Sequence, residues 1–198
     1  MPYRNLAIAY YNKEKDPAKA LDVMKKALEL DPSYPRFLQE YDQLLAKNNV
    51  SVKERLSVLE QYPHLLEERD VLYLEYITLL NKTGQYDKAL TCLKGHIFHP
   101  WEGGEGKVSG QYRYALTEKA LQEMDAGNYR DAIRLLTDTF TYPDNLGEGK
   151  LPNVQDNMAE YYIGRCYEAM DEQEKAKEYF IRASEGLSEP SVALYYND

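Results

Sequence analysis

The sequence predicts an all-α protein, a right-handed α-solenoid of about five antiparallel helix pairs over residues 1–198. Residues 84–107 recur at 127–150, which is 43 residues further along the chain. A repeat of that length is one supersecondary unit that cannot bury its apolar face alone, so neighbouring copies must share a core. Apolar residues recur at three- and four-residue steps, and no segment shows the two-residue alternation of a half-buried strand.

The duplicated stretch matches at positions that define a hairpin and a loop. Gly84-Gln85-Tyr86 returns as Gly127-Asn128-Tyr129, and the tetrad Gly104-Glu105-Gly106-Lys107 returns letter for letter as Gly147-Glu148-Gly149-Lys150. Glycine adopts positive φ at little cost, so we expect the first glycine of each copy to end a helix in the left-handed conformation. Each copy therefore predicts a helical hairpin followed by a glycine-rich loop.

The expected helix pairs span residues 3–30, 34–62, 70–98, 109–141 and 153–186, followed by a C-terminal tail at 187–198. In the first pair, Asp16-Pro17 supplies an N-cap and a proline at the first helical position. Asp31-Pro32 ends the helix that follows. In the second pair, Ser51-Val52-Lys53-Glu54 forms a capping box, and Pro63 ends the helix that it starts.

The last three pairs are predicted from the repeat and from apolar stripes. The third begins near Asp70 and turns at Gly84, and the fourth turns at Gly127. The fifth carries a stripe from Tyr162 to Ala183, with apolar residues at helical spacing. The tail either frays or covers the last pair with Val192, Leu194 and Tyr195.

Composition excludes several functional classes. The net charge is −9, with no basic cluster that would attract a phosphate backbone, so a nucleic-acid partner is not expected. No stretch approaches the roughly 20 uninterrupted apolar residues of a membrane helix, and the N-terminus lacks an apolar signal segment. Cys92 and Cys166 lie in helical pattern without metal-ligand spacing, which favours reduced core thiols and a cytoplasmic location.

The sequence also contains no recognisable catalytic or metal-binding constellation. The three histidines show no spacing with cysteine or aspartate that would hold a metal ion. No serine lies in a nucleophile-elbow pattern. Lys107 and Lys150 are followed by valine and leucine and no strand precedes them, which excludes a P-loop. We therefore expect no catalytic residues, no metal and no cofactor.

The helix pairs resemble tetratricopeptide repeats. The resemblance rests on small and aromatic residues at fixed steps, which in the fifth unit are Ile163-Gly164, Tyr167, Ala176, Phe180 and Ala183, and in the first are Leu6-Ala7, Tyr10, Ala20, Ala27 and Pro32. It implies a protein or peptide partner held in a concave groove. The later units repeat every 43 or 44 residues rather than about 34, and the surplus lies in the glycine-rich connections.

The resemblance also directs attention to inward positions of the first helix of each pair. Some members of the family hold the terminal carboxylate of a peptide with asparagine and lysine there. The corresponding positions in this chain are Ile8, Thr78, Leu121 and Arg165. None is asparagine, so that clamp is not expected, and Arg165 is the one charged candidate for partner binding.

A narrower resemblance concerns three segments. Phe98–Lys107, Asn5–Lys13 and Tyr142–Gly147 are similar to signature segments of certain large bacterial proteins. In those proteins a tetratricopeptide segment follows an N-terminal β-rich domain of unknown function that looks like a sugar-binding β-sandwich. The resemblance implies that this chain is a fragment of a longer polypeptide with a link to carbohydrate metabolism.

The two glycine-rich loops are the strongest candidates for ligand contact. Stacked repeats place equivalent loops side by side, so one pocket would be lined by His99, Trp101, Glu105, Lys107, Tyr142, Asp144, Glu148 and Lys150. A tryptophan beside carboxylates suits a sugar or a peptide. The alternative is that both loops are packed connectors whose charged side chains cap helix ends, with Trp101 as a hydrophobic plug.

Three functional hypotheses follow. The first is a non-catalytic interaction scaffold that uses the concave groove and the two glycine-rich loops to bind a protein or peptide partner, or a neighbouring domain of the same polypeptide. The second is a glycan- or small-molecule-binding module formed by the twin loops and accessory to carbohydrate metabolism. The third is an accessory domain of a glycan-active enzyme whose chemistry lies outside this chain.

Overall fold

The structure is a computed structural model that describes residues 2–151 and 154–185. Within these ranges every regular element is helical, and the all-α class with paired antiparallel helices is confirmed. The chain divides into two compact units, residues 1–84 and 85–198. The expected tail at 187–198 and the limits of the last pair, 153 and 186, lie outside the described residues. A single solenoid over the whole chain stays a prediction.

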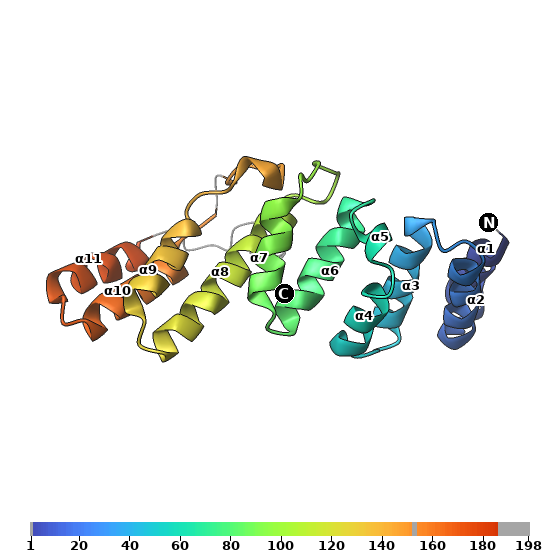
Figure 1. Ribbon diagram of the computed structural model, residues 1–198, viewed down its shortest axis with the longest axis horizontal. Coiled ribbons are helices and arrows are strands. Elements are labelled where there is room, and N and C mark those ends of the chain that lie inside the picture. Colours follow the sequence, from blue (N-terminus) through green and yellow to red (C-terminus); the bar gives the residue numbers. More distant parts are fainter. Residues whose placement is uncertain (1, 152–153, 186–198) are drawn as a thin grey trace. The chain divides into compact units, whose positions relative to one another are not determined.

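Unit 1 (residues 1–84) contains α-helices of 4 to 14 residues and one π-helical turn within its described part (Figure 1). Its elements are α1 (Pro2–Ala9), the π-helical turn η1 (Tyr10–Glu14), α2 (Pro17–Leu30), α3 (Pro35–Lys47), α4 (Val52–Leu59), α5 (Pro63–Leu66) and α6 (Asp70–Lys82). Helix α2 packs against α1 and α3, and α6 packs against α3, α4 and α5. Fully buried leucines such as Leu38, Leu59 and Leu72 form the shared core.

Helix boundaries in unit 1 follow the expected caps. The Asp16 carboxylate accepts a hydrogen bond from the backbone N–H of Lys19 at 3.0 Å, and Pro17 is the first residue of α2. Both hydrogen bonds of the capping box between Ser51 and Glu54 are present at the start of α4. The expected helix end at residue 62 is not seen, because α4 stops at Leu59 and Pro63 starts the separate turn α5.

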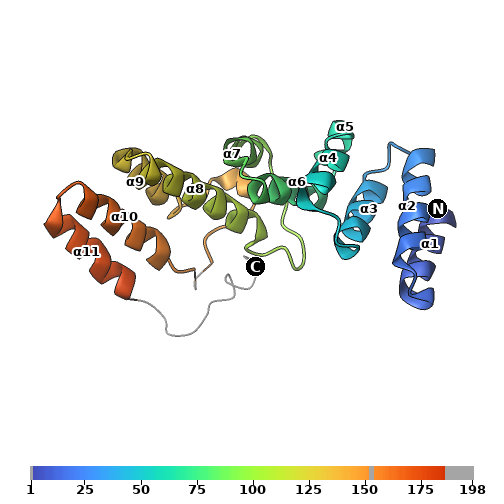
Figure 2. The same cartoon turned by 90° about the horizontal axis from the view of Figure 1, so that it is seen from below.

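Unit 2 (residues 85–198) contains α-helices of 10 to 19 residues within its described part (Figure 2). Its elements are α7 (Tyr86–Gly95), α8 (Lys107–Asp125), α9 (Tyr129–Asp138), the 3₁₀ turn η2 (Asp144–Leu146), α10 (Asn157–Ala169) and α11 (Gln173–Ser184). Helix α8 packs against α7 and α9, and α10 packs against α9 and α11. Helices α6 and α7, expected as one pair, fall on opposite sides of the boundary between the units.

The hairpin turns confirm the expected left-handed residues and add others. Gly84 and Gly127 have φ of 76° and 78°. The same conformation occurs in the other hairpins at residues that are not glycine, Lys15, Asn49 and Asp171. Gly164 of α10 is tightly packed, because an added Cβ would lie 2.7 Å from the Phe180 ring of α11. Within the described residues no helix is long and apolar enough to cross a membrane.

Candidate functional site

The two glycine-rich connections of unit 2 lie against each other. Loop 1 comprises residues 96–106, and loop 2 comprises residues 139–156 without the undescribed 152 and 153. The backbone N–H of Phe98 donates a hydrogen bond to the carbonyl of Asn145 at 2.8 Å. In Figure 1 the η2 turn of loop 2 accordingly reaches the end of α7 at which loop 1 begins. The expected adjacency of the loops is therefore present in the structure.

Glu148 of loop 2 caps the amino end of α8. Its carboxylate accepts hydrogen bonds from the backbone N–H groups of Gly106 and Ser109, each at 2.7 Å. A carboxylate at this place satisfies two orphan donors and interacts favourably with the positive end of the helix dipole. This contact joins two tetrads of identical sequence, because Gly106 belongs to the first copy and Glu148 to the second.

Asn145 of loop 2 caps the carboxyl end of α7. Its side-chain amide donates hydrogen bonds to the carbonyls of Leu93 and His96, both at 2.7 Å, at the carboxyl end of α7. Gly147 has φ of 72°, and an added Cβ would lie 2.2 Å from the carbonyl oxygen of Phe98. Only glycine fits this approach. Loop 2 therefore holds the end of α7 and the start of α8 together.

Trp101 is half-buried and packs on its own loop. A Cβ added to Gly104 would lie 2.3 Å from Cε2 of the indole, so the glycine lets the ring rest against the backbone. Trp101 lines a cavity of about 130 Å³ between the loops. The Trp101 indole therefore covers part of its own loop and also forms one wall of the cavity.

The structure brings together only some of the site residues that the sequence predicts in this region. His99, Trp101, Glu105 and Glu148 line the cavity between the loops, together with Val108, Leu146 and Leu151. Lys107, Tyr142, Asp144 and Lys150 do not line it. Lys107 begins α8, and the exposed Asp144 begins η2.

Lys150 and Tyr142 lie in a second cluster near the start of α10. Lys150 forms an ion pair with Asp156, the residue before α10, and Arg113 lies 3.6 Å from the same carboxylate. Burial raises the pKa of the Tyr142 hydroxyl, and Arg113 acts in the opposite direction. Arg113 of α8 also donates a hydrogen bond to the carbonyl of Gln155 at 2.7 Å, so the cluster joins α8 to the start of α10.

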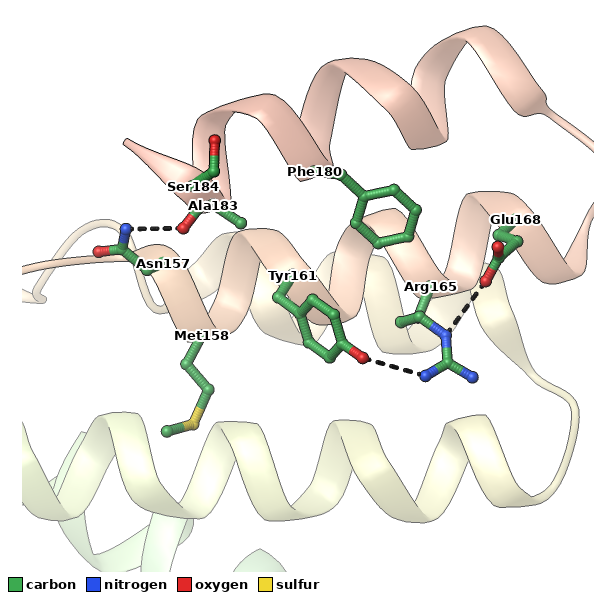
Figure 3. Close-up of a pocket in the computed structure, with 8 residues that line it drawn as sticks. All are labelled: Asn157, Met158, Tyr161, Arg165, Glu168, Phe180, Ala183 and Ser184. Atoms are coloured by element: carbon green, nitrogen blue, oxygen red, sulfur yellow. Dashed lines mark hydrogen bonds and ion pairs between the residues drawn. The ribbon is translucent and has the colours of Figure 1, made fainter. Parts of the chain in front are cut away.

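A larger, open surface groove lies on α10 and α11, on the face shown in Figure 3. It has a volume of about 770 Å³ and is lined by Asn157, Met158, Tyr161, Arg165, Glu168, Phe180, Ala183 and Ser184. We call this surface the α10–α11 groove. Its apolar side chains are exposed: Met158 keeps 64% and Tyr161 43% of their accessible surface.

Arg165, the charged candidate from the sequence, lies in this groove (Figure 3). Its Nη1 donates a hydrogen bond to the Tyr161 hydroxyl at 3.1 Å, and its Nε lies 3.2 Å from the Glu168 carboxylate. Its Nη2 makes no hydrogen bond within the described residues. Sequence reasoning missed Met158 and Tyr161. The signal was a second stripe at 158, 161, 165 and 168, one step from the buried stripe of Ala159, Ile163 and Cys166.

Unit 1 carries a separate cavity of about 250 Å³ on α1, η1, α2 and α3. It is lined by Ala7, Ile8, Tyr11, Asn12, Met24, Glu40, Gln43, Leu44 and Lys47. The ammonium of Lys47 lies 4.5 Å from the centre of the Tyr11 ring. Asn12, which follows the inward position Ile8 by about one turn, also lines this cavity and was missed as a candidate.

Comparison with known proteins supports the fold. Residues 3–34 and 158–184 match family models of the tetratricopeptide repeat. A crystal structure of MamA protein is 17% identical with a TM-score of 0.55, covering 91% of this chain and 87% of that chain. The MamA RS-1 ArsTM double mutant is 15% identical with a TM-score of 0.56, covering 91% and 90%.

A third similar structure is MamA 41-end from Desulfovibrio magneticus RS-1. It is 16% identical with a TM-score of 0.52, and the match covers 91% of this chain and 90% of that chain. Likeness at this level of identity shows the fold alone. The fold is therefore one of paired tetratricopeptide-like helices, a class that generally binds protein or peptide partners and is generally non-catalytic. The expected link to large bacterial proteins with a β-rich domain stays a prediction.

Proposed function

We propose that this chain is a non-catalytic interaction scaffold that binds a protein or peptide segment in the α10–α11 groove. The observation that carries the proposal is the exposure of Met158 and Tyr161 in an open surface groove of about 770 Å³. Large exposed apolar side chains gathered in one concavity mark binding surfaces, because burying them against a partner is favourable. Aromatic residues in such pockets often dominate binding energy.

The polar end of the groove supports recognition of a charged or carbonyl group. Tyr161 and Glu168 contact Nη1 and Nε of Arg165, which leaves Nη2 available to a ligand. A preorganised guanidinium loses little entropy when it binds a planar oxygen group. The favoured ligand is a segment with an apolar side chain near a carboxylate or carbonyl oxygen.

Selection from a peptide library tests this proposal. Peptides enriched on the native chain should bind the Met158→Ser/Tyr161→Ala variant about tenfold or more weakly, because truncating central contacts typically costs more than 1 kcal/mol. Tyr3→Ala is the matched control, since Tyr3 is equally exposed but lies on α1 of unit 1. Peptides that bind the groove variant as well as they bind the native chain would exclude the groove as the site.

The unit 1 cavity supports a second binding surface for the same kind of partner. Lys47 has no carboxylate partner in the described residues, and Asn12 and Gln43 beside it are exposed amides over an apolar floor. This set fits a peptide carboxylate, although the sequence does not predict the asparagine clamp with which some tetratricopeptide proteins hold one. Lys47→Met should weaken binding of a free-carboxylate peptide and leave its amidated form unchanged, as measured by calorimetry.

The twin loops fit a glycan module less well. Glu148 and Asn145 use their polar atoms on helix ends, and the cavity of about 130 Å³ is small beside the roughly 300–1,000 Å³ of ordinary ligand pockets. Fluorescence of Trp101, the single tryptophan of the chain, tests the alternative directly. Saturable quenching by any member of a glycan panel would favour it over the groove.

The proposal includes a cytoplasmic location in a bacterium, with the partner either a separate protein or a neighbouring domain of the same polypeptide. Cys92 and Cys166 are both unpaired thiols, as expected in a reducing compartment. Burial raises the pKa of the Cys166 thiol to about 11, so this thiol stays protonated and unreactive. Identification of the genomic neighbours and of the full-length polypeptide tests this part.

A further inference from the structure

The cavity between loop 1 and loop 2 has an apolar base and one aromatic wall. Val108 and Leu146 are buried beneath it, and Leu151 lies at its side. The indole of Trp101 forms the wall, fixed by its contact with Gly104. Such a lining suits an alkyl stem, because methylene groups gain from leaving water and from contact with an aromatic ring.

Two carboxylates line the same cavity. Glu148 is held in place because each of its oxygens accepts one backbone N–H at 2.7 Å, and each keeps a further lone pair. Glu105, its counterpart in the first tetrad, is exposed and makes no hydrogen bond or ion pair within the described residues. One carboxylate is therefore rigid and the other is available to a ligand.

The surrounding charges favour a cation. Neither lysine of the tetrads lines the cavity: Lys150 is paired with Asp156, and Lys107 starts α8 with contacts of its own. Asp144 of loop 2 is exposed. The chain as a whole carries a net charge of −9. A positively charged group is thus drawn to the loops and finds no competing lysine in the cavity.

The size of the cavity restricts the class of ligand further. A volume of about 130 Å³ holds a few methylene groups and one ammonium or guanidinium head, and is small for a sugar ring or nucleotide. A cation beside the Trp101 ring also gains from the negative face of the indole. We propose that this cavity binds a single basic side chain, lysine or arginine, presented by a partner protein.

This site is separate from the α10–α11 groove and does not depend on it. It gives an acidic scaffold a second, charge-selective contact with a basic partner. Because the carboxylates bind a cation partly exposed to water, the interaction is weak alone and sensitive to salt. Its contribution to a larger interface lies in partner choice and orientation.

Fluorescence of Trp101 with capped tripeptides tests the proposal. Acetyl-Gly-Lys-Gly-amide should give a saturable change that weakens at high salt, and acetyl-Gly-norleucine-Gly-amide, which has the stem without the charge, should not. Glu105→Gln should weaken lysine-peptide binding about fivefold, as expected for a partly exposed ion pair. Glu102→Gln is the matched control, being an exposed glutamate of the same loop outside the lining.

Several results would overturn it. An equal response to the norleucine peptide, unchanged affinity in Glu105→Gln, or no saturable response to the lysine peptide each excludes a basic side-chain site. Free n-butylammonium binding more tightly than the lysine peptide would assign the cavity to small amines instead of a partner side chain. Loss of lysine-peptide binding in Tyr161→Ala would place that binding in the groove, whereas retention separates the two sites.

Discussion

At the scale of single residues, one buried charge network holds unit 1 together. Asp42 on α3 is 1% exposed, and both of its oxygens accept hydrogen bonds from Arg55 on α4, at 2.9 and 2.6 Å. The same guanidinium reaches Glu75 on α6 at 2.5 Å. A buried charge without its partner is costly, so the network couples three helices.

Asp42→Ala should lower the free energy of unfolding of unit 1 by about 3 kcal/mol, because it leaves the largely buried Arg55 with only the half-exposed Glu75. Urea denaturation followed by circular dichroism measures the loss. Arg36→Ala is the control, since Arg36 is an exposed partner of Glu40 and should cost less than about 1 kcal/mol. Equal costs for the two variants would show that the buried network contributes nothing special.

A second prediction at the scale of residues concerns the stability of unit 1 at acidic pH. Burial alone would raise the pKa of the Glu40 carboxyl, but hydrogen bonds from Arg4 and Arg36 lower it below its ordinary value. A carboxyl with a lowered folded-state pKa stabilises the fold above its unfolded pKa, and that stability is lost as pH falls through the folded value. The pKa of the Asp42 carboxyl shifts in the opposite direction, because burial raises it.

Glu40→Gln should therefore flatten the acid limb of the stability curve. The measurement is the urea midpoint of unit 1 between about pH 3 and pH 7, around the ordinary glutamate pKa. The native chain should lose more stability over this range than the variant does. Parallel curves for the two proteins would mean that the ion pairs of Glu40 do not stabilise the folded state.

At the scale of elements, the helix hairpins use one turn conformation with different residues. In the last hairpin the N–H of Glu172 bonds the carbonyl of Tyr167 at 2.9 Å, and the equivalent bond in the α8–α9 hairpin joins Asn128 to Glu123 at 2.8 Å. The residue before each donor is left-handed: Asp171 in one hairpin and Gly127 in the other. A side chain in that conformation carries a strain that glycine avoids.

Asp171→Gly should raise the stability of unit 2 by about 0.5–1 kcal/mol, since it removes this strain. The adjacent Glu172→Gly should instead destabilise, because Glu172 has φ of −91° and gains nothing from glycine. Thermal unfolding of both variants measures the difference. A lower midpoint for Asp171→Gly would show that the aspartate side chain contributes more than its conformation costs.

Local rules explain which elements the sequence could predict. The caps at Asp16 and Ser51 act within three residues, so the local sequence pattern is sufficient to predict these two helix starts. Left-handed turns were predictable where glycine occupies them, and missed at Lys15 and Asp171, where the hairpin geometry outweighs residue preference. The sequence predicts that the helix before Pro63 ends at residue 62, whereas α4 ends at Leu59. The difference arises because proline can also be the first residue of a new helix, as Pro63 is in α5.

The candidate sites show the corresponding limit. Adjacency of the loops followed from the repeat, and four of the eight loop candidates line one cavity. The sequence could not show that Lys150 is drawn away by Asp156. The sequence also could not distinguish the groove-lining residues of α10 from its buried residues, because the stripe containing Tyr161 runs beside the stripe containing Ile163.

At the scale of the whole molecule, the unusual repeat length has a structural use within unit 2. The surplus residues of loop 2 bind the end of α7 through Asn145 and the start of α8 through Glu148. A plain short turn after α9 would lack the reach for both contacts. The two identical tetrads consequently have different roles, with Glu148 engaged and Glu105 exposed.

This difference gives a matched test on two glutamates in the same four-residue sequence. Glu148→Ala should lower the free energy of unfolding of unit 2 by about 1–2 kcal/mol, as loss of a helix cap does, and Glu105→Ala by less than about 0.5 kcal/mol. Hydrogen exchange should show lost protection at the amides of Gly106 and Ser109 in the first variant only. Unit 1 should exchange as in the native chain, because no cap there is altered. Identical exchange at Gly106 and Ser109 in the two variants would contradict the capping role, and with it the explanation of the long repeat.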